Sequence, residues 1–332
     1  MIMAIVVKLK HLSPLHIGTG KENYDFSSTV LQSDTLSAAL AAIRVQKGKM
    51  DDVEGFLSSF TISSAFPYYG DILFMPKPNG KISVNVTDME EYSSRKKLKK
   101  VKFVEFDLWK RLLCGEPVNV TSSQLKDSFL LSTKSVPAFV TPYKSQVNQR
   151  VSVPRNEGAD AEPFFFDWTY YQENAGLYCL LDAPNDMIGE LQDLFKLLGE
   201  YGLGTDKNVG GGKFEVEIIA EPINFDFVES ANASMLLSLY IPIENEVVQL
   251  NLPESKYELV LRGGYMAGSN EEDFKHLRKK SVYAFSVGSI FPTTAKLSGK
   301  IVDLRPSWND ERMHPVYRSG KPFLVPIKVN DL

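Results

Sequence analysis

A glycine-rich loop between a helix and a strand constrains this chain more than any other feature. Residues 202–214 contain five glycines and two lysines. The preceding residues, 187–198, repeat apolar side chains at the spacing of a helix with one buried face. The following residues, 213–218, alternate charged and apolar side chains, which is typical of a strand. The sequence therefore predicts a helix, a glycine loop and a strand, in that order.

This order argues against a mononucleotide site. Phosphate-binding loops of the P-loop and Rossmann kinds run strand, loop, helix and direct the helix N-terminus at the anion. Here the order is reversed, and Phe214 stands where a P-loop needs Ser or Thr. The loop can still bring backbone amides close to a polyanion, with Lys207 and Lys213 supplying charge. The alternative is a flexible helix-to-strand connection.

The spacing of this loop is G-h-G-x5-G-x-G-x-F, where h is apolar. It resembles the glycine-rich loop of the RAMP superfamily, the RNA-binding proteins of CRISPR effector complexes. In that superfamily the loop follows the second helix of a ferredoxin-like domain, as it does here. Where the family loop usually carries an Arg-Ser-like pair, this chain has Lys207-Asn208. The RNA-binding candidates that the resemblance implies in this loop are Gly204, Lys207, Asn208, Gly210, Gly211 and Gly212.

Composition sets wider limits. The chain has 332 residues, of which 43% are hydrophobic and 23% charged, as in a globular protein of about two domains. It lacks an apolar run of ~18 residues and opens without the basic segment of a signal peptide, so we expect a cytoplasmic protein without a membrane partner. Two cysteines and four histidines support neither a disulfide framework nor a metal site, and we expect no cofactor. A net charge of −4 leaves RNA binding to local clusters of Lys and Arg.

The N-terminal segment predicts the opening of a βαββαβ unit. Residues 4–10 read as a strand, and a helix begins near Ser33 or Asp34. His16 lies between them and is a candidate general base or RNA contact; the alternative is a loop histidine bonded to backbone. This segment also resembles the opening of the RAMP subunits that cap the 5′ end of guide RNA in type III-A (Csm) complexes. His16 and Gly18 are its candidate RNA contacts.

A basic run is the strongest electrostatic feature of the chain. Six of the eight residues in 95–102 are Lys or Arg, and Phe103 and Phe106 follow them. Single-stranded RNA is commonly held by cations on phosphates and by rings under bases, although such a run can also be a solvated face. The RNA-binding candidates here are Lys96, Lys97, Lys99 and Lys100.

An insertion follows. In RAMP subunits an insertion before the later strands commonly forms a β-hairpin thumb that presses on the guide RNA, and the resemblance implies such a thumb at about residues 133–165. Arg150 and Arg155 are its candidate phosphate contacts, although loop arginines often serve only solubility.

The second half predicts a smaller unit. Strand patterns occur at residues 235–241, 257–262, 282–287, 301–304 and 323–328. Helical signal is confined mainly to 270–280. In the second of these strands Tyr257, Leu259 and Leu261 share one face and Arg262 takes the other. Arg262, Gly263 and Gly264 are the RNA-binding candidates of this unit.

We therefore expect an α+β fold of two ferredoxin-like domains with antiparallel sheets and a β-hairpin thumb, the second domain being reduced. The first domain spans residues 1–222 and includes the glycine-rich loop 202–214; the second spans 223–332.

The resemblance implies a function in antiviral defence. It implies a non-catalytic subunit of a type III-A interference complex that binds the 5′ handle of the crRNA. Its implied protein partners are the large polymerase/cyclase subunit and the backbone RAMP subunit that cuts target RNA. No sequence context of a Ser/His/Asp triad, a metal site or paired carboxylates indicates an enzyme. Two alternatives remain open: a RAMP endoribonuclease that processes repeat RNA with His16 as general base, and a scaffold that touches protein only.

Overall fold

A computed structural model describes residues 3–18, 24–154, 160–266, 268–269 and 271–330. Arg155 lies outside the described residues. The α-helices are α1 (Ser33–Gln46), α2 (Val53–Ser58), α3 (Glu91–Lys100), α4 (Phe106–Leu113), α5 (Asn185–Tyr201) and α6 (Glu244–Gln249). Short 3-10 turns are η1 (Ser122–Gln124), η2 (Lys207–Val209) and η3 (Glu272–Phe274). The strands of the first two thirds are β1 (Met3–Lys10), β2 (Thr61–Ile62), β3 (Phe66–Tyr69), β4 (Ile72–Pro76), β5 (Val84–Val86), β6 (Phe103–Glu105), β7 (Val118–Val120), β8 (Leu125–Lys126), β9 (Phe129–Leu130), β10 (Tyr143–Ser152), β11 (Glu162–Tyr171), β12 (Ala175–Asp182) and β13 (Glu215–Asn224). Those of the last third are β14 (Ala233–Leu236), β15 (Leu259–Arg262), β16 (Val282–Phe285), β17 (Ile290–Phe291), β18 (Ile301–Asp303), β19 (Tyr317–Ser319) and β20 (Leu324–Ile327).

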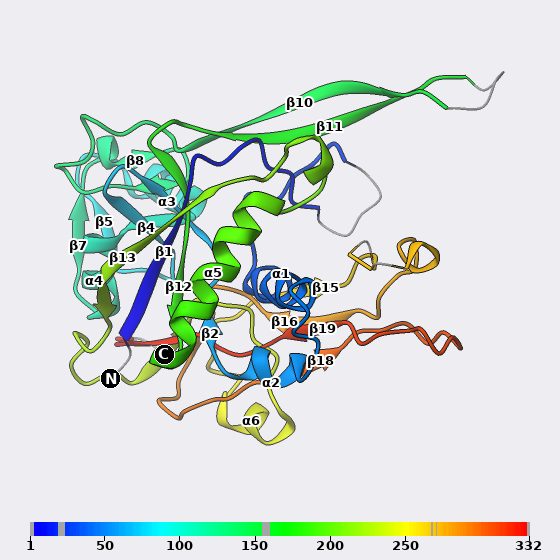
Figure 1. Ribbon diagram of the computed structural model, residues 1–332. Helices are drawn as coiled ribbons and strands as arrows, with labels where there is room; N and C mark the ends of the chain where they lie inside the picture. Colours follow the sequence, from blue (N-terminus) through cyan, green and yellow to red (C-terminus); the bar gives the residue numbers. More distant parts are fainter. Residues whose placement is uncertain (1–2, 19–23, 155–159, 267, 270, 331–332) are drawn as a thin grey trace.

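The largest sheet runs in the order β13-β1-β12-β3-β4-β6-β9-β8, and the fold is mixed α+β as expected (Figure 1). Most strand pairs are antiparallel, but β6 pairs with β9 and β5 with β7 in parallel. The prediction of antiparallel sheets therefore holds for most strand pairs and is wrong for these two. Both parallel pairs close crossovers that contain a helix, α4 for β6–β9 and α3 and α4 for β5–β7, and a crossover of that length permits parallel pairing.

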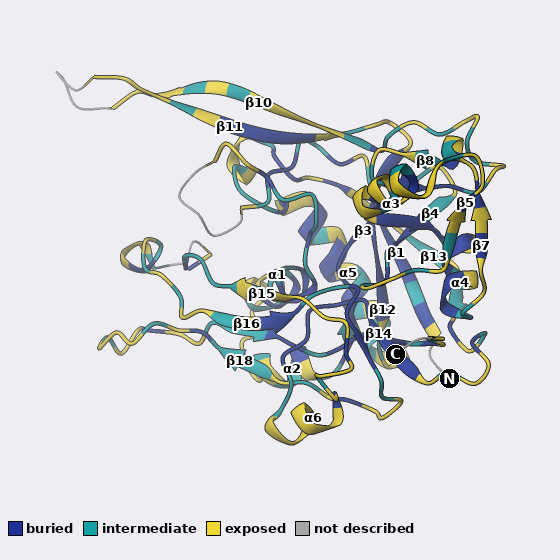
Figure 2. Cartoon of the chain, turned by 180° about the vertical axis from the view of Figure 1, so that it is seen from behind, coloured by how far each residue is buried: buried dark blue, intermediate teal, exposed yellow. Residues whose placement is uncertain are grey.

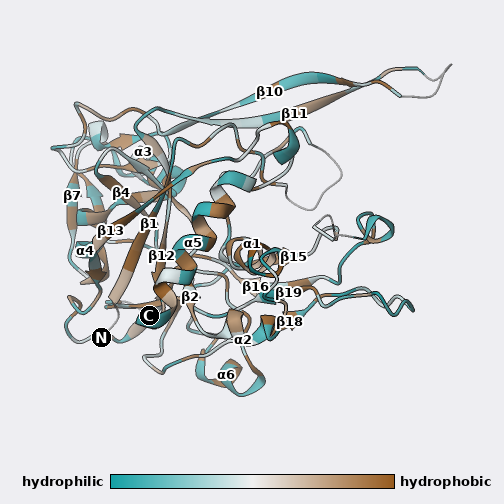
Figure 3. Cartoon of the chain, viewed as in Figure 1, coloured by the Kyte–Doolittle hydropathy of each residue, from teal (hydrophilic) through white to brown (hydrophobic). Residues whose placement is uncertain are grey.

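One face of the central sheet is covered by α1 and α5 (Figure 1). Val7 and Leu9 of β1 pack there with Cys179 of β12, and the apolar faces of the two helices complete a buried cluster. In α5 this face consists of Leu191, Leu194, Phe195 and Leu198, the residues that carry the helical spacing in the sequence. In Figure 3, β1 of the central sheet is coloured as hydrophobic, whereas β10 is largely hydrophilic.

The opposite face of the sheet packs against α4 and the segments around it and against the C-terminal part of the chain. Val6 and Leu180 on that face belong to the same buried cluster as Met235, Leu237 and Val325. The two halves of the chain therefore share one continuous core rather than meeting through a linker.

The C-terminal part contains small sheets of order β17-β14-β20, β15-β16 and β18-β19. Strands β15, β16, β18 and β20 lie within the ranges that the sequence predicts, whereas β14 ends at Leu236 rather than at residue 241, and β17 and β19 were not predicted. The helix expected at 270–280 is wrong, because the described residues there form only η3. Arg278 instead forms a β-bridge with Tyr265, and the amide of Lys279 donates to Gly264, which holds the second half of this segment extended. The short helix α6 was not anticipated.

A long two-stranded hairpin, β10–β11, projects from the molecule. Its register runs from the Tyr143–Tyr171 pair at the base to the Ser152–Glu162 pair near the tip. Side chains of β11 are buried at the base, whereas the outer part of the hairpin is exposed (Figure 2). The range expected for a thumb, 133–165, overlaps this hairpin, which begins and ends later in the chain.

Candidate nucleic-acid interface

The glycine loop packs on the segment that follows β1. The Thr205 amide donates to the His16 carbonyl at 3.1 Å, and the Gly212 amide donates to the Pro14 carbonyl at 2.9 Å. The Ser13 hydroxyl completes the junction: it donates to the Gly210 carbonyl at 2.8 Å and accepts from the Lys213 amide at 2.7 Å. These bonds make the loop a fixed element rather than a flexible connection.

The amides of the three consecutive glycines are already used within the chain. Gly210 donates to the Lys207 carbonyl at 3.1 Å and Gly211 to the Asp206 carbonyl at 3.2 Å, while Gly212 donates to Pro14. A backbone amide has one proton to donate. These amides are therefore engaged with protein acceptors rather than presented to a phosphate.

Close packing explains why several of these positions are glycine. A Cβ added at Gly204 would lie 2.2 Å from the His16 carbonyl oxygen, and one at Gly212 would lie 1.9 Å from the Leu203 carbonyl oxygen. At Gly211 it would meet the Trp168 ring at 2.6 Å. Gly210 differs, because a Cβ there would meet nothing within 4 Å and only its φ of +89° favours glycine.

His16 is buried beneath this loop, with 1% of its surface exposed. Its ring packs on Phe166 with centroids 4.5 Å apart, and Nδ1 lies 2.8 Å from the Asp167 carbonyl oxygen. The imidazole therefore does not reach the surface, which matches the alternative of a backbone-bonded histidine. Gly18, two residues later, is exposed.

Arg150 joins the hairpin to the glycine loop. Its guanidinium lies over Phe166, 4.4 Å from the ring centroid, and over Trp168 at 5.2 Å. It also forms an ion pair with Asp206 of the loop. An aromatic face and a carboxylate together hold a guanidinium well. The structure thus uses Arg150 to fix the base of the hairpin against residues 204–212.

Exposed groups surround this junction. Lys207 and Asn208 lie at the exposed tip of the loop. Tyr24 stacks on Phe166 at 5.7 Å with 49% of its surface exposed, and Phe165 is 56% exposed. The junction therefore presents the Tyr24 ring at the base of the hairpin and Lys207 and Asn208 on the adjoining loop, whereas Phe165 takes the opposite face of β11 from Phe166. We define Tyr24, Lys207 and Asn208, with Arg150, as the loop–hairpin surface.

The basic run forms most of α3. Lys96, Lys97, Lys99 and Lys100 are all exposed, and Lys77 tethers the helix by donating to the Leu98 carbonyl at 3.3 Å. Phe103, expected to border RNA, is instead buried in β6. Figures 1 and 2 both place α3 near β5 and β8, apart from the loop that follows α5.

Arg262 is engaged in an ion pair rather than presented to solvent. Its Nε and Nη2 atoms each donate at 3.0 Å to a different oxygen of Asp34, which lies in the first turn of α1. Burial alone would raise the pKa of Asp34, but Arg262 and Arg318 lower it below its ordinary value. Next to it, a Cβ at Gly263 would meet the Ser281 hydroxyl at 2.6 Å, whereas Gly264 has open space around it.

The face of β15 opposite Arg262 is exposed. Leu259 and Leu261 are each 54% exposed and Tyr257 is 39% exposed. Tyr283 of β16, which pairs with Leu261, is 63% exposed on the same ribbon. Apolar alternation in the sequence located this face but did not show which side of the ribbon the core covers.

Several residues of these sites were missed by the sequence analysis. Asp206 and Phe166 act only through partners distant in sequence, and no local pattern marks them. Arg318 and Lys279, which lie near the Asp34–Arg262 pair, sit in segments without a motif. Tyr24 carries a weak signal, as an aromatic residue in a polar loop.

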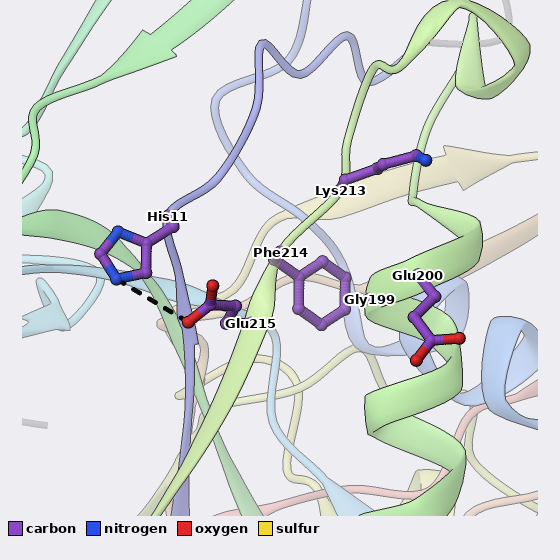
Figure 4. Close-up of a pocket in the computed structure, with 6 residues that line it drawn as sticks. All are labelled: His11, Gly199, Glu200, Lys213, Phe214 and Glu215. Atoms are coloured by element: carbon purple, nitrogen blue, oxygen red, sulfur yellow. Dashed lines mark ion pairs between the residues drawn. The ribbon is translucent and has the colours of Figure 1, made fainter.

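A surface hollow between the end of α5 and the start of β13 offers little to a polyanion (Figure 4). Glu200 and Glu215 line it beside Lys213, and Glu215 lies 3.9 Å from His11. Among the described residues, no group of three or more His, Cys, Asp or Glu side chains could hold a metal ion. No helix in the same part of the chain is long and apolar enough to cross a membrane.

Comparison with known families covers both halves of the chain. The profile of the RAMP superfamily matches residues 8–215, and the profile described as "CRISPR Csm4 C-terminal domain" matches residues 229–327. The protein named "CRISPR system Cms protein Csm4" in Mycobacterium tuberculosis is 25% identical over 308 residues, covering 92% of this chain and 93% of that protein. Its namesake in Streptococcus thermophilus is 25% identical over 327 residues, covering 95% and 96%.

Solved structures agree at the level of the fold. A chain of the Csm3–Csm4 subcomplex of a type III-A CRISPR-Cas interference complex superposes with a TM-score of 0.65 at 20% identity, covering 99% of this chain and 100% of that chain. A chain of a Csm1–Csm4 cassette in complex with cA4 gives a TM-score of 0.61 at 19% identity, with all of both chains covered (100% each).

Proposed function

The chain belongs to the RAMP superfamily, whose profile matches residues 8–215, and we propose that it is a non-catalytic crRNA-binding subunit of a type III-A CRISPR interference complex. In this role it binds the 5′ handle of the guide RNA. The match of residues 229–327 to the Csm4 C-terminal domain supports the type III-A assignment.

The finer description of the fold follows from the same assignment. The order β13-β1-β12-β3, with α1 and α5 in the crossovers, supports the assignment of a βαββαβ ferredoxin-like unit. We assign residues 1–222 to this first domain and 223–332 to a reduced second one. The β10–β11 hairpin takes the part of the thumb.

Two protein partners complete the proposal. Solved relatives are described as subcomplexes of Csm4 with Csm3 and with Csm1. We propose that this chain likewise docks on the backbone RAMP subunit that cuts target RNA and on the large polymerase/cyclase subunit.

The observation that carries the RNA-binding proposal is the loop–hairpin surface. Lys207 and Asn208 are exposed on a loop that is fixed by backbone bonds, and the exposed Tyr24 ring stacks on Phe166 at the adjoining base of the hairpin. A cation for phosphates beside a ring for an unpaired base suits single-stranded RNA. The amides of Gly210 to Gly212 already donate to protein carbonyls, so we assign the phosphate contacts to side chains. Gly18 and Gly204 remain candidate positions where the RNA backbone approaches the protein. The exposed lysines of α3 provide a second cationic contact for RNA or a partner.

The nuclease alternative is disfavoured. A general base must come within hydrogen-bond reach of the proton that it removes. His16 is 1% exposed and is bonded to the Asp167 carbonyl. The scaffold alternative makes a different prediction, namely RNA affinity that responds neither to Lys207 nor to salt.

The test uses a labelled single-stranded RNA with a repeat-derived 5′ handle. We expect Lys207→Ala to weaken binding several-fold and to reduce the slope of log K against log salt by about 0.7, the value for one phosphate on a single strand. Lys196→Ala is the matched control, because Lys196 is an exposed lysine on α5. Equal affinities and slopes for wild type and both variants would contradict the proposed surface.

A further inference from the structure

The Asp34–Arg262 pair belongs to a larger cluster with unbalanced charge. Arg318 lies on β19, with Nε 3.9 Å from an Asp34 carboxylate oxygen and Nη1 donating to the Asp34 carbonyl at 3.3 Å. Lys279 interacts electrostatically with Asp34, Arg262 and Arg318. Three cations therefore surround one carboxylate.

These groups are withdrawn from water. The side chains of Arg262 and Arg318 are 23% and 17% exposed and that of Asp34 is 4% exposed. Burying charge is costly unless the charge is paired. One carboxylate balances one of the two guanidinium groups, so the cluster lacks about one negative charge, and about two when Lys279 is protonated.

Three donor groups of the cluster have no partner among the described residues. Arg262 donates through Nε and Nη2 to Asp34 and Thr35. Arg318 donates through Nη1 to the Asp34 carbonyl, and its Nε forms a longer ion pair with the Asp34 carboxylate at 3.9 Å. This leaves Nη1 of Arg262, Nη2 of Arg318 and Nζ of Lys279. A phosphate group, with its several acceptor oxygens and negative charge, matches donors of this kind.

We propose that this cluster, formed by Arg262, Lys279 and Arg318 around Asp34, is a binding site for one backbone phosphate of the RNA. Asp34 acts as a positioning residue, because it holds the two guanidinium groups in place without touching the ligand. The proposal deepens the proposed function and rests on it.

The position of the cluster supports an RNA ligand. Figures 1 and 2 show the β10–β11 hairpin and the loops after β15 and β18 extending toward the same side of the molecule. Arg262 ends β15 and Lys279 lies in the segment that follows it, so the elements that carry the cluster lie on the side toward which the hairpin extends. Gly264, two residues after Arg262, has open space where a side chain would stand, which leaves room for an RNA backbone to approach.

Lys279 gives the site a signature in pH. Its burial and the nearby Arg318 lower its pKa to about 7, with Arg262 acting in the same sense and Asp34 opposing them. A bound phosphate would favour the charged ammonium. Binding at this site should therefore weaken as the pH rises from 6.5 to 8.5.

The test measures binding of full-length protein to handle RNA with variants of the cluster. We expect Lys279→Gln to weaken binding roughly tenfold, the loss of one charge-assisted bond. Lys279→Arg should retain binding and lose the pH dependence, since an arginine stays charged over this range. Lys280→Gln, at an exposed neighbouring lysine, is the matched control and should bind as wild type does.

A second arm locates the contact on the RNA. Methylphosphonate replaces one handle phosphate at a time, which removes its charge. Methylphosphonate at one handle position should weaken RNA binding by the wild type but should not weaken binding by Lys279→Gln any further. Inorganic phosphate at constant ionic strength is then added as a competitor of RNA binding to wild type. Weak competition supports a site that is specific for a polynucleotide. Strong competition would show that any phosphate suffices and would overturn the RNA assignment.

The outcomes separate this inference from the function on which it rests. If handle RNA does not bind at all, the proposed function fails. If RNA binds wild type, Lys279→Gln and Lys280→Gln equally, the loop–hairpin surface stands and the phosphate site at the cluster is wrong.

Discussion

Single glycines in residues 202–214 act through the atoms that lie next to them. A Cβ is excluded at Gly204 and Gly212 by carbonyl oxygens and at Gly211 by a ring, and the amides of Gly210, Gly211 and Gly212 donate to protein acceptors. Glycine spacing of this kind is thus compatible with RNA binding but supplies rigidity rather than a nest of amides. The phosphate contacts must then come from side chains such as Lys207.

Gly212 provides the sharpest test of this view. A Cβ there would lie 1.9 Å from the Leu203 carbonyl oxygen, at a φ of +68°. We expect Gly212→Ala to lower the free energy of unfolding by about 3 kcal/mol, since backbone strain of this kind costs about 1–3 kcal/mol even without a clash. Urea denaturation measures it. Gly210→Ala, with a similar φ but open space, should cost only about 1 kcal/mol; equal losses would show that packing at Gly212 is not limiting.

Lys279 predicts a pH-dependent stability. Its pKa is lowered from 10.5 to about 7 in the folded protein. Below pH 7 the folded state carries a buried charge at a cost, and between 7 and 10.5 the unfolded state binds more protons, so wild-type stability gains from rising pH. Lys279→Met should therefore raise the thermal midpoint at pH 6.5, with a difference that shrinks toward pH 10. A difference that stays constant with pH would contradict the lowered pKa.

Individual site residues differ in how far the sequence alone reveals their roles. Lys207 is recognisable because the glycine motif around it is local. The pairing of Arg262 with Asp34, 228 residues earlier, is not readable from either segment. His16 has the residue type of a general base, and only the three-dimensional packing against Phe166 shows that it is buried.

Helix α3 carries the densest cluster of exposed lysines among the described residues. Its polar face carries Lys96, Lys97, Lys99 and Lys100, and only Ser94 is buried. We expect replacement of all four lysines by Gln to reduce the salt dependence of RNA binding by about 0.7 for each phosphate that they contact. Stability should change little, because exposed charges contribute little to folding.

A second measurement on the four-lysine variant tests whether it still assembles with the large subunit and the backbone subunit. If the four-lysine variant binds RNA as wild type does but no longer assembles with the large subunit or the backbone subunit, α3 is a protein-docking element. If both activities are unchanged, the solvated-face interpretation holds and the proposed contact is wrong.

Elements with strong periodicity were predicted well, and those set by long-range pairing were not. The face of α5 and the strand β1 follow directly from apolar spacing. The expected helix at 270–280 fails because Arg278 pairs with Tyr265 in a bridge that no periodicity encodes. The hairpin base depends on Arg150, Phe166 and Asp206, which lie on different segments.

At the scale of the whole molecule, the two halves are joined by a shared core and by the Asp34 cluster. Removing one partner of a buried ion pair costs about 3–5 kcal/mol because the other is left unpaired. We expect Asp34→Asn to lower the unfolding free energy by about 3 kcal/mol, measured by urea denaturation. Arg262→Gln should be destabilising too, and the double variant should cost less than the sum of the single ones. Strict additivity would show that the two residues act independently.

The overall class could be predicted because it rests on local patterns and on the resemblance to RAMP proteins. The parallel pairs β5–β7 and β6–β9 could not, because the strands are short and joined through helices. The continuous core between the halves also escapes the sequence, since apolar residues of both halves fit separate domains equally well.

The central claim is that this chain holds the 5′ handle of a guide RNA without cutting it. The most direct measurement incubates the protein, alone and with its large-subunit partner, with labelled handle RNA and with a scrambled RNA of the same length, and resolves each mixture on native and denaturing gels. We predict a shift that is selective for the handle, with the RNA intact. A shortened product that disappears in His16→Ala, or equal binding of the handle and scrambled RNAs, would contradict the claim.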